Sequence, residues 1–371
     1  MMQTWAILFD AYRELNARKM FWISLAISLL VVCVFAGLGI NEKGIELLWF
    51  TVEIGPLTTA LMSRSLFYKT LFMSVGLTIW LGWASTILAL VSTASIIPDF
   101  VSSGSIEGML ARPISRTRLF LTKYFASLLF VVLQALVFCA ASILVIGVRG
   151  GVWLWGLMLA VPIITLFFSY LYCVSALVGV WTRSTLASLL ASLAVWGVVL
   201  AMGIAENGLL IAKISAENPI PLIEKDVEAR ELQVRKAKEE STDPAAFMKL
   251  EKRLEDRRVD LIEQREKVAS IDTWYRIAFT AKTILPKTGD TKELLERAII
   301  NDREMEQMAN MASDSNGRGG GGPFGASDMK AVRQADKINK SRSLWWVIGT
   351  SLLFEAFIVA WACRIFARRD F

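Results

Sequence analysis

The sequence contains no histidine, and its four cysteines stand far apart inside apolar stretches. A chain without histidine lacks the commonest metal ligand and the usual general base at neutral pH. The isolated positions of Cys33, Cys139, Cys173 and Cys363 do not fit the spacing of a zinc site or a disulfide framework. We therefore expect no metal site in this chain.

Motifs for nucleotide binding and catalysis are missing as well. The single glycine-rich run, Gly317–Gly322, is not followed by the lysine and lacks the strand-to-helix setting of a phosphate-binding loop. Its composition, within residues 313–328, is instead typical of a flexible linker. Nucleophile elbows and paired catalytic carboxylates near the apolar runs are also absent, so we predict that the chain is not an enzyme.

Apolar residues are abundant: 54% of the 371 residues are hydrophobic, more than a soluble domain of this length could bury. Crossing about 30 Å of hydrocarbon takes about 20 helical residues. We therefore predict an all-α polytopic membrane protein with six transmembrane helices. The six apolar runs are residues 21–40, 71–97, 124–148, 152–181, 184–205 and 343–363.

The distribution of Lys and Arg predicts the orientation. If the N-terminus is cytoplasmic, the short inner segments hold eleven of these residues and the short outer loops hold four. We therefore expect a multi-pass protein of the inner (cytoplasmic) membrane with both termini inside, the last segment being residues 343–371 with their basic tail. The net charge of +6 then reflects orientation rather than a nucleic-acid partner.

Residues 1–20 have an amphipathic pattern. Trp5, Leu8, Phe9 and Tyr12 share one helical face, and charged residues occupy the remainder. The pattern predicts a helix lying along the inner membrane surface, although an ordinary first helix facing the solvent is the alternative.

A highly charged insert, residues 206–342, follows the first five spans of residues 21–205. Within it Phe247, Leu254, Leu261 and Val268 recur every seven residues, while Arg257 and Gln264 interrupt the apolar positions between them. We predict a helical hairpin or short coiled coil.

The number of spans before the insert decides on which side of the membrane it lies. Five spans place it outside the cytoplasm. Residues 45–62 are the segment most open to miscounting, because they are apolar but contain Glu53 and Pro56. We interpret them as an interfacial or re-entrant piece; a full span there would move the insert to the cytoplasm.

The stretch "GSIEGMLARPISRTRLFLTKY", residues 104–124, separates the second and third spans. Gly104 permits a tight turn, residues 105–111 can form a short helix, and Pro113 ends that helix. Ser115 can then cap a helix that continues into the third span. A basic loop of this kind most often only determines topology. A short stiff helix joined to two spans can also receive a push from a soluble partner.

This stretch resembles the coupling region of type-2 ATP-binding-cassette transporter permeases. The start "YRELNARKMFW" is similar to the connecting helix of that family, and the resemblance extends over nearly all of the chain except residues 206–342. The positions that match the family's coupling pattern are Gly104, Glu107, Leu110, Pro113, Ser115, Arg116, Lys123 and Tyr124.

The resemblance implies a half-transporter. Two six-span subunits, identical or different, would each dock on a separate ATPase subunit that binds ATP and Mg²⁺, so that this chain carries no cofactor. Glu107 and a coupling helix at about residues 104–116 would sit in a cleft of that ATPase, with Arg112 and Arg116 against its acidic rim or lipid headgroups. We expect an exporter permease in the lipid bilayer. The alternative is a membrane-anchored scaffold or sensor whose helical insert binds a partner.

Glu355 is the only charged residue inside the predicted spans. A carboxylate near the middle of a span costs about 2.5–3.5 kcal/mol, so it is expected to be paired, protonated or in contact with water. One interpretation is that Glu355 lines the substrate path or accepts a proton. The other is that it binds a Ser, Thr or Trp on a neighbouring helix, within the chain or in a dimer contact.

Overall fold

The protein consists of two compact units, each assembled from segments that are distant in sequence. The apolar unit is made of Met1–Leu200, Leu285–Gly320 and Ser343–Phe371, and the hairpin unit of Ala201–Ile284 and Gly321–Arg342. The computed structural model describes residues 19–42, 44–47, 50–52, 62–102, 115–240, 244–300, 304 and 326–368.

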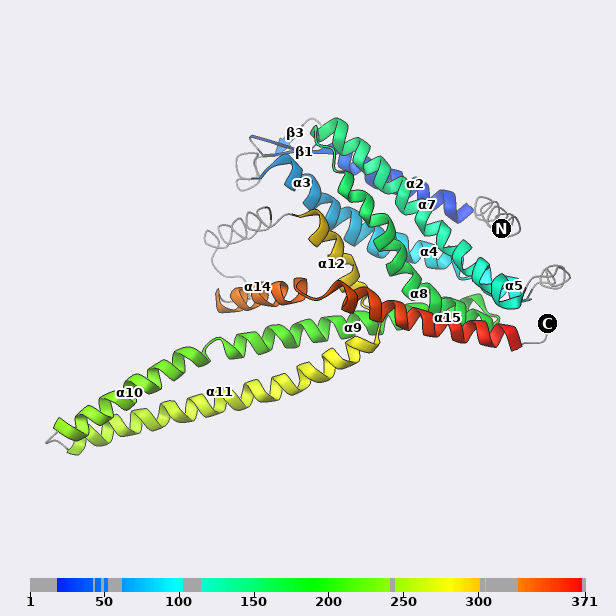
Figure 1. Ribbon diagram of the computed structural model, residues 1–371. Helices are drawn as coiled ribbons and strands as arrows, with labels where there is room; N and C mark the ends of the chain where they lie inside the picture. The colour runs from blue at the N-terminus through cyan, green and yellow to red at the C-terminus, as the bar shows by residue number, and fades with distance from the viewer. Residues whose placement is uncertain are drawn as a thin grey trace. The chain divides into compact units, whose positions relative to one another are not determined.

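Helices dominate the apolar unit (Figure 1), with π-helical turns in η1 and η3 and a 3₁₀ turn in η2. Its helices are α2 (Lys19–Gly37), α3 (Arg64–Leu71), η1 (Phe72–Ser85), α4 (Thr86–Thr93), α5 (Ile96–Ser102), α7 (Arg116–Gly150), η2 (Trp155–Leu159), α8 (Ala160–Thr182), α12 (Thr288–Ile299), η3 (Trp345–Gly349) and α15 (Thr350–Arg368). The hairpin unit contains α10 (Ile220–Glu240), α11 (Pro244–Ile284) and α14 (Ala326–Lys340), and α9 (Thr185–Glu217) belongs to both units.

Among the described residues, six helical stretches are long and apolar enough to cross a membrane, which confirms the six predicted apolar helices and indicates a multi-pass membrane protein. Several of these helices begin before their apolar run does, because a polar N-cap residue determines where the helix starts. Ser63, for example, accepts a hydrogen bond from the Leu66 N–H and starts the second stretch. The six stretches are Lys19–Gly37, Arg64–Val101, Arg116–Gly150, Trp155–Thr182, Thr185–Glu239 and Trp345–Arg368.

The fourth and fifth apolar stretches run in opposite directions. Between α8 and α9, Ser175 lies 2.7 Å from Ser188, and Phe167 packs edge-on against Trp196. The earlier residue of α8 thus meets the later residue of α9, as an antiparallel pair requires. An antiparallel pair is what two successive crossings of a bilayer need.

A small antiparallel sheet follows α2, an addition that the sequence did not predict. Its strands are β1 (Leu38–Asn41), β2 (Gly44–Leu47) and β3 (Phe50–Val52), in the order β1-β2-β3. The Tyr68 hydroxyl donates to the Leu38 carbonyl over 3.2 Å, which ties the sheet to α3. The interfacial or re-entrant piece predicted at residues 45–62 therefore begins as strands, and residues 53–61 lie outside the described part.

The insert of residues 206–342 is divided between the two units. Helix α11 ends at Ile284, and Pro286 separates it from α12, because proline cannot continue a helix. Helix α12 belongs to the apolar unit, since Leu294, Leu295 and Ile299 are buried there. Most of the predicted linker, residues 313–325, lies outside the described residues.

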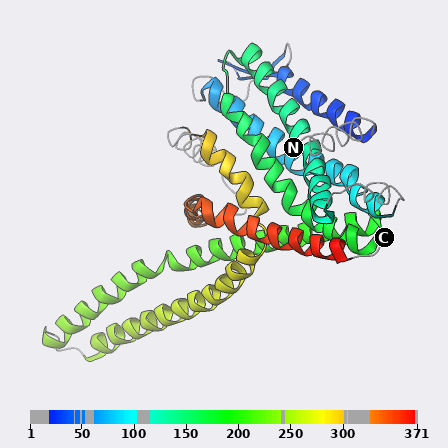
Figure 2. The same ribbon diagram turned by 45° about the vertical axis from the view of Figure 1, so that its right-hand side comes forward.

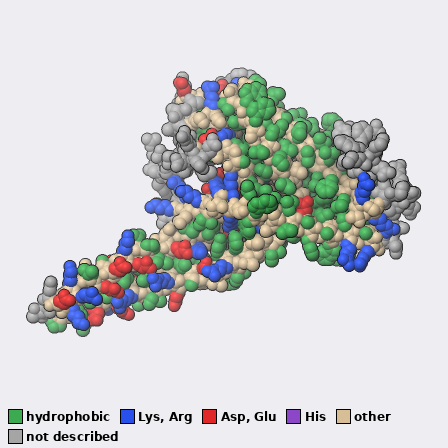
Figure 3. Space-filling model, viewed as in Figure 1, with side chains coloured by type: hydrophobic (Ala, Val, Ile, Leu, Met, Phe, Trp, Pro, Cys, Tyr) green, Lys and Arg blue, Asp and Glu red, His purple; other side chains and the backbone are tan. Residues whose placement is uncertain are grey.

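Helices α10 and α11 lie side by side in both views (Figure 1, Figure 2) and run antiparallel. Arg257 binds Asp226 over 2.9 Å, and the Gln264 amide donates to the Ala216 carbonyl over 2.9 Å. The two polar residues that interrupt the heptad pattern therefore face partner helices and are bonded there. Charged side chains of both signs cover this hairpin, whereas hydrophobic side chains cover the apolar unit (Figure 3).

Two leucines of the hairpin provide a matched test of its packing. Leu254 of α11 is 6% exposed and Leu232 of α10 is 57% exposed. Leu254→Ala should destabilise the hairpin by about 2–3 kcal/mol because it leaves a cavity, whereas Leu232→Ala should change its stability by less than about 0.5 kcal/mol. Amide hydrogen exchange of α11 measures both. Equal effects would contradict this packing.

Candidate functional site

The carboxylate of Glu355 lies among three helices of the apolar unit. Its Oε1 accepts a hydrogen bond from the Tyr124 hydroxyl of α7 over 2.8 Å, and its Oε2 lies 2.8 Å from the Ser169 hydroxyl of α8. In the described part of the chain these two hydroxyls are the hydrogen-bond partners of the carboxylate. Pairing with a serine of a neighbouring helix is thus present within one chain, and a role in a substrate path stays a prediction.

Aromatic rings enclose this carboxylate on the α7–α8 side. Tyr124 stacks on Tyr172 with ring centroids 5.4 Å apart, and Tyr172 stacks on Phe168 at 5.7 Å. The Tyr172 hydroxyl donates to the Ser127 hydroxyl over 2.7 Å, so a second bond joins the same two helices. All four residues are buried, and the arrangement can hold a proton or a polar group in an otherwise apolar interior.

A second polar group of the apolar unit is the amine of Lys287, at the start of α12. Lys287, which is 1% exposed, lies just before this helix, and its Nζ is 4.3 Å from the centroid of the Trp346 ring. The same amine donates to the Thr350 hydroxyl, while the Lys287 backbone N–H donates to the Ser351 hydroxyl over 3.0 Å. Ser351 precedes Glu355 by one helical turn on α15, so both polar groups lie along one helix face.

The other side of α12 faces the π-helix η1. Lys292 Nζ lies 5.2 Å from the centroid of the Phe167 ring, and a methyl group added at Gly82 would lie 3.2 Å from this amine. Burial lowers the pKa of Lys292 below its ordinary value, while the neighbouring Glu293 carboxylate raises it. π-helical segments are rare and often accompany functional sites, and here both η1 and η3 pack against α12.

The residues that flank the predicted coupling helix are firmly anchored. Ser115 caps α7 by accepting a hydrogen bond from the Arg118 N–H over 3.4 Å, which confirms the predicted cap. Arg116 donates to the Ala367 carbonyl near the end of α15, also over 3.4 Å. Gly104, Glu107, Leu110, Arg112 and Pro113 lie outside the described residues.

Aromatic packing joins the two ends of this segment. Phe366 of α15 stacks on Phe100 of α5 and on Phe120 of α7, at centroid distances of 6.1 Å and 5.7 Å. Lys123 Nζ lies 5.6 Å from the centroid of the Phe100 ring. Aromatic contacts therefore join α5, which precedes residues 103–114, to α7, which follows them, through α15.

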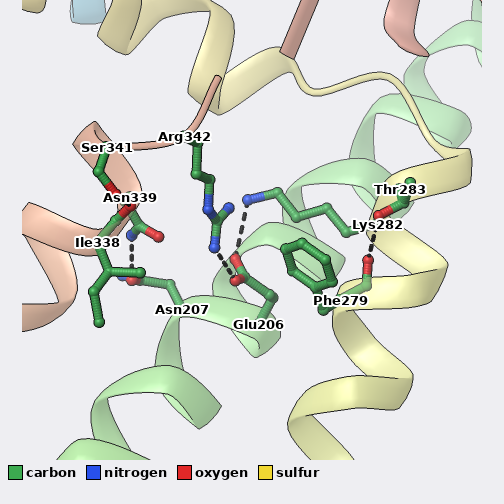
Figure 4. A network of polar contacts seen from close by, with 9 residues as sticks. All are labelled: Glu206, Asn207, Phe279, Lys282, Thr283, Ile338, Asn339, Ser341 and Arg342. Carbon is green, nitrogen blue, oxygen red and sulfur yellow. Dashed lines mark hydrogen bonds and ion pairs between the residues drawn. The ribbon is translucent and has the colours of Figure 1, made fainter. Parts of the chain in front are cut away.

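The hairpin unit has a charged cluster of its own (Figure 4). Glu206 of α9 is fully buried, and its carboxylate binds Lys282 of α11 over 3.0 Å and also Arg342, which follows α14. The Arg342 guanidinium lies 5.5 Å from the centroid of the Phe279 ring. A buried carboxylate with two cationic partners ties three segments together, and removing one partner of such a cluster is strongly destabilising.

Comparison with known proteins adds no assignment: a scan against protein-family models, a search of curated proteins and a search of solved structures each gave no match. Among the residues that the structure describes, no three Cys, Asp or Glu side chains gather closely enough to bind a metal ion.

Sequence reasoning found Glu355 and Ser115 but missed three features. Tyr124 was identified only through the family resemblance, not as a partner of Glu355. Lys287 and Glu206 were not singled out, because each lies in or beside a stretch rich in charge. The available signal was a lysine next to a helix-breaking proline, and a glutamate that directly follows an apolar run.

A double-mutant cycle tests the bond between Tyr124 and Glu355. Each single change, Tyr124→Phe and Glu355→Gln, should lower the free energy of unfolding by about 1–2 kcal/mol, because each removes or weakens an interhelical hydrogen bond. The double variant should lose less than the sum of the two. Titration with SDS in mixed micelles measures these free energies.

Tyr68→Phe is the matched control, since the Tyr68 hydroxyl bonds the Leu38 carbonyl near the other end of α7. The losses of unfolding free energy caused by Tyr68→Phe and Glu355→Gln should therefore add. If the losses caused by Tyr124→Phe and Glu355→Gln also added strictly, Tyr124 and Glu355 would not interact.

Proposed function

We propose that this chain is the membrane-spanning permease subunit of an ATP-binding-cassette exporter, energised by a separate ATPase subunit. The observation that carries the proposal is the bond from Tyr124 to Glu355. Tyr124 ends the stretch 104–124 that resembles the family's coupling region, and Glu355 is the half-buried carboxylate of the last apolar helix. One hydrogen bond thus links the segment that would meet the ATPase to the helix that would line the path.

The anchored ends of residues 103–114 support the same proposal. A segment can transmit a push only if its ends are held by the helices that must move. The stack of Phe100, Phe366 and Phe120 supplies that attachment on both sides, and Arg116 adds a bond to the end of α15. In this proposal, movement of the segment displaces α5, α7 and α15 together.

Binding of the partner ATPase should depend on the charged side chains within residues 104–116. Glu107→Ala with Arg112→Ala should reduce the amount of ATPase that co-purifies with the tagged chain from its own membrane, because both side chains would lie at the contact. The matched control is Glu251→Ala with Arg253→Ala on α11, which should leave co-purification unchanged.

Replacing residues 104–116 with a Gly/Ser linker is the stronger version of this test. Undiminished co-purification of the ATPase with that variant would refute the coupling role. If the hairpin control alone reduced a co-purifying protein, the scaffold or sensor function would be favoured instead.

Transport itself tests the role of Glu355. Glu355→Gln keeps the size of the side chain and the hydrogen bond from Tyr124 but removes the negative charge and the proton acceptor. A role in the substrate path predicts a loss of export at normal expression, measured in cells or in vesicles with the ATPase present. Unchanged export would reduce Glu355 to a helix-pairing residue.

A further inference from the structure

Exposed charge is unevenly distributed along α11. About every second residue is charged from Pro244 to Val268, whereas only Asp272, Arg276 and Lys282 are charged from Ala269 to Ile284. In this second part Thr273, Ile277, Thr280 and Ile284 are exposed at a spacing of three or four residues, and Trp274 and Arg276 are exposed beside them. Ile277 and Ile284 are 55% and 71% exposed.

Helix α9 has a similar face at the start of the hairpin unit. Ala201, Ala205, Gly208 and Ala212 are exposed at the same spacing, together with Ile204, which is 75% exposed. We call these two segments, 201–212 of α9 and 273–284 of α11, the hairpin base. Both border the apolar unit in the chain, since Leu200 and Leu285 are its adjoining residues.

Charged residues within the hairpin base, apart from the exposed Arg276 near its outer end, are turned inward and bonded. Glu206 is enclosed by Lys282 and Arg342. Just beyond the hairpin base, Asp272 binds Lys213 over 2.8 Å and Arg276 over 2.7 Å. The hydrogen bond from Lys213 holds the pKa of the Asp272 carboxyl below its ordinary value. Farther along the hairpin the charged pairs are exposed instead, as are Arg265 and Glu224.

An aromatic and a basic residue mark the boundary between the two regions. Trp274 is 62% exposed, and Arg276, two residues later, has an exposed side chain. Tryptophan and arginine are the residues that gather where hydrocarbon gives way to headgroups.

We propose that the hairpin base is immersed in one leaflet of the bilayer, with lipid chains against its uncharged faces and headgroups at the level of Trp274 and Arg276. This contact does not depend on transport activity. It adds residues 273–284 of α11 to the membrane surface of the fifth apolar stretch, to which residues 201–212 of α9 already belong.

Lipid fits this surface better than a second copy of the chain. The exposed face of α11 continues beyond the hairpin base through Glu266, Ile262, Val259 and Glu255. A helix from a second copy that followed this face would bury both glutamates. A bilayer covers only the end next to the apolar unit, which is where the charge disappears.

The test compares two residues on the same face of α11. Ile277 and Val259 are 18 residues apart, which is about five helical turns and about 27 Å along the axis. Ile277→Cys and Val259→Cys are each labelled with bimane in a Cys33→Ala background, since Cys33 is the exposed native cysteine and the other three are buried. The full chain is reconstituted in phosphatidylcholine–phosphatidylglycerol vesicles, and quenching by nitroxide lipid is compared with quenching by iodide.

The label at position 277 should be quenched severalfold more by nitroxide lipid than the label at 259, and severalfold less by iodide. Ile284→Cys, on the same face of α11, should behave like Ile277→Cys and serves if that variant does not fold. Equal iodide quenching at 277 and 259 would place the base in water and overturn the proposal. Protection of position 277 from both quenchers would mean that protein, such as a second copy, covers it, which also overturns the proposal.

Discussion

Polar groups inside the apolar unit must find their partners within the protein, because hydrocarbon offers none. Small hydroxyls meet this constraint locally, as Thr93 does by donating to the Ala89 carbonyl one turn earlier. The carboxylate of Glu355 cannot do so, and it reaches Tyr124 and Ser169 on two other helices. The packing of α7, α8 and α15 brings both hydroxyls to this carboxylate, so the constraint favours this fit over one that leaves the carboxylate without hydrogen bonds.

Much of the apolar unit could be predicted from the sequence because its signals are local. Runs of about 20 apolar residues are read directly as membrane-crossing helices. The cap at Ser115 follows from a serine placed after Pro113 and before an apolar run, and Glu355 stands out as one charge in such a run. The number of helices and these two residues therefore followed from short stretches of sequence.

The rest depends on contacts between distant segments. Strands of three or four residues are too short for their alternation to be recognised, so β1–β3 were missed. Glu206 meets partners 76 and 136 residues away, and its place after an apolar run does not identify them. Helix α12 looks like another charged helix of the insert. Only the structure places Leu295 and Ile299 in the core of the apolar unit.

The central claim is that force from a soluble ATPase enters through the segment between α5 and α7, which requires this segment to face the cytoplasm. Labelling of Glu107→Cys with a membrane-impermeant maleimide, before and after the cells are permeabilised, tests this requirement most directly. The account predicts labelling only after permeabilisation. Labelling of intact cells to the same extent would place the segment outside and contradict the account.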